Sequence, residues 1–96
     1  MNSFEKLEPM LLSQPRLMVM SILYKQNEAE FSMLKKITKM SAGNLSVQIN
    51  NLSKVGYIEV VKQFKGNYPL TICKITNKGI FVFEDFFKSL NTYLVI

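Results

Sequence analysis

The residues of this sequence best suited to chemistry are hydrogen-bonding side chains between residues 42 and 55. In this segment Leu45, Ile49, Leu52 and Val55 recur at helical spacing and form one apolar stripe. The other side of the predicted helix is mostly polar and carries Gly43, Asn44, Ser46, Val47, Gln48, Asn50, Asn51 and Lys54. Asn and Ser are poor helix formers, whereas Asn and Gln amides match the donors and acceptors of base edges, notably adenine. The pattern favours a face selected for hydrogen bonding over an ordinary solvated helix face.

Positive charge is concentrated in the middle of the chain. The net charge is +5, yet residues 31–78 hold eight lysines against one acidic residue, Glu59, a net of +7. Residues 1–30 hold three basic and four acidic residues, and residues 79–96 hold one and two, so each flank has a net charge of −1. This asymmetry is expected if the central half faces a polyanion. A solvated lysine surface is the alternative interpretation.

Catalytic and metal-binding chemistry is poorly supported. The sequence has no histidine, one cysteine and no glycine-rich phosphate loop, and its seven carboxylates are scattered. We therefore predict that the chain is not an enzyme and that it holds no metal or cofactor. Cys73 is interpreted as a small buried hydrophobic residue, with a redox role as the weaker alternative because no second cysteine or neighbouring cation is evident.

The elements that must position these residues follow from periodicity and caps. We expect one domain over residues 1–96, of α+β class. Helices are predicted at about 3–11, 16–25, 31–40 and 42–55, the last capped by Ser41 and ended by Gly56. A polar connection is predicted at 26–30, strands at 57–64 and 70–75 around a turn at 65–69, and a long helix at about 76–94.

Six segments in this order carry a resemblance to a known family: Pro15–Leu17, Phe31–Leu34, Ser41–Leu52, Val55–Val60, Lys65–Thr71 and Ile75–Gly79. Over roughly residues 13–92 the chain resembles winged helix-turn-helix transcriptional regulators of the MarR and ArsR type. It is most similar to the compact archaeal and bacterial group with a C-terminal dimerisation helix. The resemblance implies a three-helix core, a two-stranded β-hairpin wing and a long C-terminal helix.

The resemblance also implies roles for individual residues. Helix 42–55 would be the recognition helix in the major groove, with base contacts from Asn44, Ser46, Val47, Gln48, Asn50 and Asn51. The wing, residues 62–70, would reach the backbone or minor groove. The implied backbone contacts are Ser32, Lys35, Lys36, Ser41, Lys54, Lys62, Lys65, Asn67 and Tyr68. The family often has arginine where this chain has Val47, Asn67 and Tyr68, and the Cys or His clusters of ArsR-type metal sites are missing.

The final helix carries two apolar stripes, and a helix that packs only on its own domain needs one. We therefore predict a homodimer whose interface includes Phe4, Leu7, Val82, Phe86, Leu90, Tyr93 and Leu94. The predicted function is sequence-specific binding of double-stranded DNA as a homodimeric transcriptional regulator. The alternative is a winged-helix protein-interaction module without specific DNA binding. The single cysteine and the lack of a signal or membrane segment predict a cytoplasmic protein, and the sequence identifies no effector.

Overall fold

The computed structural model describes residues 3–94 and confirms the predicted α+β class. The helices are α1 (Gln14–Gln26), α2 (Phe31–Thr38), α3 (Ala42–Lys54) and α4 (Asn77–Leu90), with short 3-10 turns at Pro9–Leu11 and Asn91–Tyr93. The strands are β1 (Glu28–Glu30), β2 (Ile58–Lys65) and β3 (Tyr68–Ile75). The first two and last two residues of the predicted domain, 1–96, lie outside the described residues.

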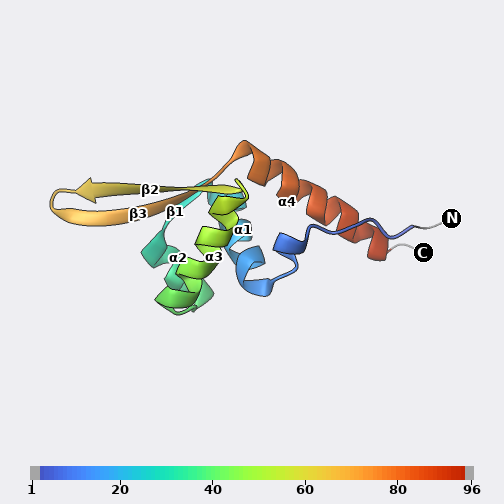
Figure 1. Cartoon of the computed structure of the whole chain (residues 1–96), viewed down its shortest axis with the longest axis horizontal. Helices are drawn as coiled ribbons and strands as arrows, with labels where there is room; N and C mark the ends of the chain where they lie inside the picture. The colour runs from blue at the N-terminus through green and yellow to red at the C-terminus, as the bar shows by residue number, and fades with distance from the viewer. Residues whose placement is uncertain (1–2, 95–96) are drawn as a thin grey trace.

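The molecule is elongated, with extents of 60 × 25 × 21 Å. Helices α1, α2 and α3 pack together at the centre, the β2–β3 hairpin extends to one side, and α4 extends to the other (Figure 1). The N-terminal segment runs beside the far end of α4 (Figure 1). The hairpin and α4 therefore leave the helical core in opposite directions.

The antiparallel sheet has the order β1–β3–β2, so β3 is its central strand. The β2–β3 ladder runs from the pair Ile58–Ile75 to the pair Lys65–Tyr68. Gly66 turns the chain with a φ of +63°, a left-handed conformation that favours glycine. The predicted turn at 65–69 is thus too long, because pairing continues through polar and aromatic residues up to the two-residue turn.

The predicted polar connection at 26–30 is partly wrong, because Glu28–Glu30 forms the edge strand β1. Ala29 pairs with Cys73 and is buried, while the glutamates on either side are exposed. Strand formation here depends on a partner more than forty residues away along the chain, and three residues are too few to show a period.

Hydroxyl side chains begin three of the helices, as polar caps do in general. Ser13 Oγ accepts from Arg16 N, Ser41 Oγ accepts from Asn44 N, and Thr76 Oγ1 accepts from Gly79 N. The predicted cap of α3 at Ser41 is confirmed, as is its stop at Gly56, whose φ is +81°. Both ends of α3 are therefore defined by local sequence.

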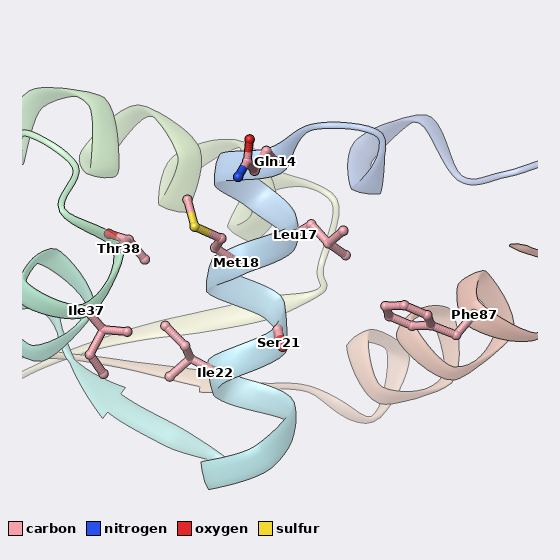
Figure 2. A pocket seen from close by; sticks show the side chains of 8 residues that line it. All are labelled: Gln14, Leu17, Met18, Ser21, Ile22, Ile37, Thr38 and Phe87. Atoms are coloured by element: carbon pink, nitrogen blue, oxygen red, sulfur yellow. The ribbon is translucent and has the colours of Figure 1, made fainter.

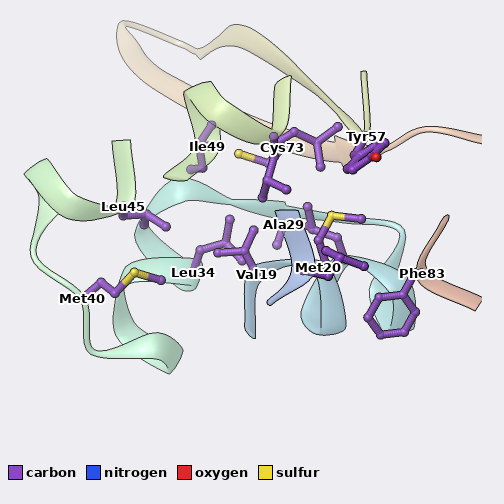
Figure 3. Packing of buried hydrophobic residues seen from close by; sticks show 14 of the residues in the cluster. Val19, Met20, Ala29, Leu34, Met40, Leu45, Ile49, Tyr57, Cys73 and Phe83 are labelled. Carbon is purple, nitrogen blue, oxygen red and sulfur yellow. The ribbon is translucent and has the colours of Figure 1, made fainter. Parts of the chain in front are cut away.

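One apolar cluster holds the three central helices, the sheet and α4 together (Figure 3). The predicted stripe of α3 points into it, with Leu45, Ile49 and Leu52 buried. They pack in a cluster with Val19 of α1 and Cys73 of β3, both fully buried. Because the stripe is occupied by the core, the opposite side of α3 faces outward.

The predicted helix at 3–11 is wrong. This segment is extended up to a 3-10 turn at Pro9–Leu11, and only Leu11 is buried there. Its conformation comes from contacts with the other end of the chain, where Glu5 N donates to Thr92 Oγ1 (3.1 Å) and the Tyr93 hydroxyl donates to Glu5 O (2.9 Å). The final helix is also shorter than predicted, because α4 ends at Leu90 and a 3-10 turn follows.

Candidate nucleic-acid interface

The outward face of α3 presents most of the residues predicted to contact bases. Asn44, Ser46, Val47 and Asn50 are exposed, whereas Gln48 and Asn51 are half-buried at the flanks. Val47 is 53% exposed even though it is apolar. The face therefore combines amide and hydroxyl groups with one exposed aliphatic side chain, a mixture suited to base edges and thymine methyl groups.

Gln48 is held by its neighbours on both sides of its amide. Arg16 of α1 donates from Nη1 to Gln48 Oε1 (3.0 Å), and Gln48 Nε2 donates to Asn44 Oδ1 (2.9 Å). Arg16 also donates from Nε to the carbonyl oxygen of Met10 (2.7 Å). Sequence reasoning missed this role of Arg16, because its contact with Gln48 depends on how α1 and α3 pack.

The wing contributes a hollow of about 340 Å³ beside α3. Lys62 on β2 lines it together with Ser46 and Asn50 of α3. Because side chains alternate along a strand, Phe64 lies on the same face of the hairpin as Lys62. The structure thus brings one predicted backbone-contact lysine next to two predicted base-contacting residues.

The tip of the wing is aromatic as well as basic. Phe64 is 74% exposed and pairs across the hairpin with Pro69, while Tyr68 is 72% exposed and pairs with Lys65. Phe64 was not among the predicted site residues. Its position between two lysines of a predicted hairpin could have indicated a role in binding. Apolar side chains on such arms can wedge between base steps in the minor groove.

A second hollow lies between the start of α2 and the first half of β3, and it is lined by Ser32 and Tyr68 among others. Ser32 is exposed and its Oγ donates to Glu30 Oε2 at 3.5 Å. Ser41 uses its oxygen as the α3 cap, which leaves its hydroxyl hydrogen free to donate. Lys35, Lys36, Lys54 and Asn67 are exposed, and neither hollow includes them.

Six of the eight central lysines are free to meet an anionic partner. Within residues 3–94 the only ion pair is Lys74–Glu28 (3.8 Å), and the Lys78 ammonium donates to Val55 O (2.9 Å). The six lysines without such partners in this part of the chain are Lys35, Lys36, Lys39, Lys54, Lys62 and Lys65. The positive charge is thus available on α2, α3 and the wing.

Cys73 lies away from this surface. Its side chain is fully buried, and burial raises the pKa of the thiol to about 11. The neutral thiol is the form present near neutral pH, as expected for a core residue. In the part of the chain described here, no three acidic, histidine or cysteine side chains gather as metal ligands. Among the helices of residues 3–94, none combines the length and the apolar content that spanning a bilayer requires.

The apolar residues predicted for a dimer interface do not all lie at the surface. Phe4, Tyr93 and Leu94 are exposed, and Leu7, Val82 and Leu90 are half-buried. Phe86 is only 3% exposed because it packs in the core of its own chain, so it offers almost no surface to a second copy.

Two exposed aromatic residues of α4 were missed. Phe81 is 70% exposed. Phe87 lies at one side of an apolar groove along α1, and Ile37 of α2 lies at the other (Figure 2). The sequence pattern showed that α4 has excess apolar surface, but it could not separate the residues that face the core from those that face outward.

Two comparisons of the sequence with known proteins each cover most of the chain. A family model described as a winged helix DNA-binding domain matches residues 16–94. An uncharacterized protein of Methanocaldococcus jannaschii is 32% identical over 71 residues, which cover 74% of this chain and 77% of that protein.

Among solved structures, a transcriptional regulator homologue from Pyrococcus horikoshii OT3 superposes with a TM-score of 0.84 at 28% identity, covering 88% of this chain and 84% of that one. A mutant of MarR from E. coli, complexed with operator DNA, has a TM-score of 0.72 at 17% identity and supports the fold alone. It covers 84% of this chain, which spans 57% of that one.

Proposed function

The chain belongs to the winged helix DNA-binding domain family, and on this premise we propose that it binds specific double-stranded DNA sequences as a homodimeric transcriptional regulator. The family model confirms the predicted winged-helix DNA-binding family, and the transcriptional regulator homologue from Pyrococcus horikoshii OT3 confirms the fold. Such regulators are not enzymes, so the chain is not an enzyme. What the family leaves open is which residues read the DNA and how two copies assemble.

The observation that carries the proposal is the outward face of α3. Its apolar stripe is buried in the core, while Asn44, Val47 and Asn50 are exposed on the other side. A helix with these properties fits the major groove, where its N-terminal residues meet base edges. We assign base contacts to these three residues, to Ser46 and Asn51, and to Gln48 through its partner Asn44.

Backbone contacts are assigned to the groups on either side of α3. Lys62 lines the hollow beside Asn50, and Lys65 stands near the tip of the same hairpin. We add Ser32, Lys35, Lys36, Ser41, Lys54, Asn67 and Tyr68 as contacts to phosphates or to the minor groove. Lysine neutralises phosphates as a flexible point charge, so these residues supply affinity and the α3 face supplies discrimination.

The homodimer is proposed from the apolar surface at the α4 end. Phe4, Phe81 and Leu94 are each at least 70% exposed, and the Tyr93 ring packs against Phe4 in a tilted arrangement at a centroid distance of 4.9 Å. Burying such side chains against a second copy is worth about 25 cal/mol per Å² of apolar surface. The dimer would place two recognition helices in successive major grooves, about 34–36 Å apart. We propose α4 with the 3-10 turn after it (about 76–94) as the dimerisation element.

The experiment selects bound sequences from a random pool of double-stranded DNA and then compares single substitutions. Asn50→Ala is expected to lower discrimination at one base pair by about tenfold, within the 1–3 kcal/mol of a good base contact. Lys65→Ala should instead weaken selected and random DNA alike. If Asn50→Ala reduces binding to both DNAs equally, base readout by α3 is wrong. If binding shows little dependence on salt, the protein-interaction module is the better assignment.

A further inference from the structure

We propose that Arg16 is a positioning residue that sets the hydrogen-bonding polarity of Asn44, so that Asn44 faces DNA as a donor and prefers guanine to cytosine. This inference rests on the proposed function, because it concerns how α3 reads a base. It differs from the sequence expectation that asparagine on this face would suit adenine. The evidence is a chain of hydrogen bonds from the 3-10 turn through α1 to the first turn of α3.

This series of hydrogen bonds can run in only one direction from donor to acceptor. Arginine has five N–H donors and no acceptor, so any group bonded to its guanidinium must accept. Arg16 Nε donates to Met10 O (2.7 Å) and Nη1 donates to Gln48 Oε1 (3.0 Å). Two bonds from one planar group to two different elements hold the guanidinium in place. The oxygen of the Gln48 amide must therefore face Arg16.

The orientation of the Gln48 amide in turn fixes the orientation of the Asn44 amide. With its oxygen on Arg16, Gln48 turns Nε2 toward Asn44 and donates to Oδ1 (2.9 Å). The two residues are four apart on α3, the spacing at which helical side chains meet. This bond turns Asn44 Oδ1 toward Gln48 and occupies one of its two lone pairs. The Asn44 Nδ2 amino group, with two hydrogens, is therefore the part directed toward a partner.

Asn44 occupies a position from which this polarity matters. It lies in the first turn of α3, is exposed, and its backbone N–H is bonded to Ser41 Oγ (3.1 Å). In the major groove guanine offers two acceptors, N7 and O6, whereas cytosine offers an N4 amino donor. The bidentate contact of asparagine with adenine needs a donor and an acceptor together. An Asn44 that is held as a donor is therefore matched best to guanine and worst to cytosine.

A purely structural role for Arg16 makes a different prediction. If Arg16 only joined α1 to α3, its loss would lower stability and would leave the base preference unchanged. The discriminating readout is thus the preference at one base pair, measured beside the melting temperature.

The test starts from the duplex that wild-type protein selects from a random DNA pool. Asn44→Ala identifies the base pair that Asn44 reads, as the position whose preference disappears. At that position wild type is expected to favour guanine over cytosine by about tenfold. Arg16→Lys keeps the charge but carries its donors on a single nitrogen, so it does not reproduce the separate Nε and Nη1 bonds. It should reduce this preference to below about twofold. Preferences at other positions and binding to random DNA should stay unchanged.

Two further variants keep the inference falsifiable if Arg16→Lys fails to fold. Gln48→Met removes the amide that links Arg16 to Asn44, at a half-buried surface position, and should have the same effect as Arg16→Lys. Asn44→Asp removes the donor and should turn the preference toward cytosine. Asn27→Asp, at an exposed position outside the proposed interface, is the control for the added charge. A wild-type preference for adenine or cytosine at this position would overturn the inference, as would a guanine preference that survives both Arg16→Lys and Gln48→Met.

Failure of the proposed function gives a different result. If wild-type protein enriches no sequence from the pool, specific DNA binding is wrong and the inference falls with it. If a sequence is enriched but Asn44→Ala changes the preference at no position, only the inference is overturned.

Discussion

Removing one wing lysine should make DNA binding less dependent on salt, by an amount that follows from the number of unpaired lysines in the proposed interface. Five lysines of the proposed interface are without an ion-pair partner in the described residues: Lys35, Lys36, Lys54, Lys62 and Lys65. If each meets a phosphate, a dimer makes about ten such contacts, and log Kobs against log salt has a slope of about −9. Lys65→Ala removes two of the ten and should raise the slope to about −7. Over a fourfold rise in salt the variant then loses about tenfold less affinity than wild type.

The assay is fluorescence anisotropy of a labelled duplex, titrated at salt concentrations from about 50 to 200 mM, the range over which this effect is large. Lys88→Ala is the matched control, because it removes the same charge from α4, on the opposite side of the core from the wing (Figure 1). Its slope should equal that of wild type. If both variants change the slope equally, the protein responds to net charge alone, and the assignment of Lys65 to a phosphate contact is refuted.

Gly79→Ala should lower the free energy of unfolding by at least about 1–3 kcal/mol in urea denaturation, because its Cβ would lie directly against Tyr57 O and 2.9 Å from Ile75 Cγ1. Gly43→Ala, whose Cβ meets nothing within 4 Å, should be neutral or stabilising by up to about 1 kcal/mol. Stability should also fall between about pH 9 and 11, since burial raises the pKa of Cys73 from 9.0 to about 11 and only the unfolded thiol ionises in that window. The loss, about 2–3 kcal/mol by linkage, should be smaller in Cys73→Ala than in wild type. Phe81→Ser should shift sedimentation toward the monomer, whereas Met33→Ser, which removes an exposed apolar side chain from α2, should not.

Local sequence was sufficient to predict α3. Its stripe of Leu45, Ile49 and Leu52, its cap at Ser41 and its stop at Gly56 all agree, and the structure places the helix at Ala42–Lys54. The features that local sequence misplaced depend on distant partners. Strand β1 exists because Ala29 meets Cys73 on β3.

The N-terminal segment shows the same dependence. The spacing of Phe4, Leu7 and Leu11 is compatible with a helix, yet the segment is extended, and Glu5 is bonded to Thr92 and Tyr93 at the other end of the chain. A pattern of apolar residues cannot distinguish a helix face from an extended segment when the partner is absent from the local window.

The candidate site also combines features that local sequence predicts with features that depend on tertiary packing. The residue types on the α3 face and the lysines around it follow from composition and periodicity. The interaction of Arg16 with Gln48 does not, because it joins residues 32 apart and depends on where α1 crosses α3. Phe64 was overlooked because its exposure depends on the hairpin extending beyond the helical core, where no other element of residues 3–94 covers the tip (Figure 1).

The geometry of α3 separates stability from recognition at most positions but not at Gln48. Ser46, Val47 and Asn50 are exposed, so substitutions there should change DNA preference with little effect on unfolding, as is usual for surface positions. Gln48 bonds to Arg16 on one side and to Asn44 on the other, so a change there alters a contact between two helices and the presentation of a base-reading residue together. Double substitution should reveal this coupling. Arg16→Lys and Gln48→Met should have non-additive effects on base preference, whereas Arg16→Lys and Asn50→Ala should be additive, since the hydrogen bonds of Arg16 lead to Asn44 and not to Asn50.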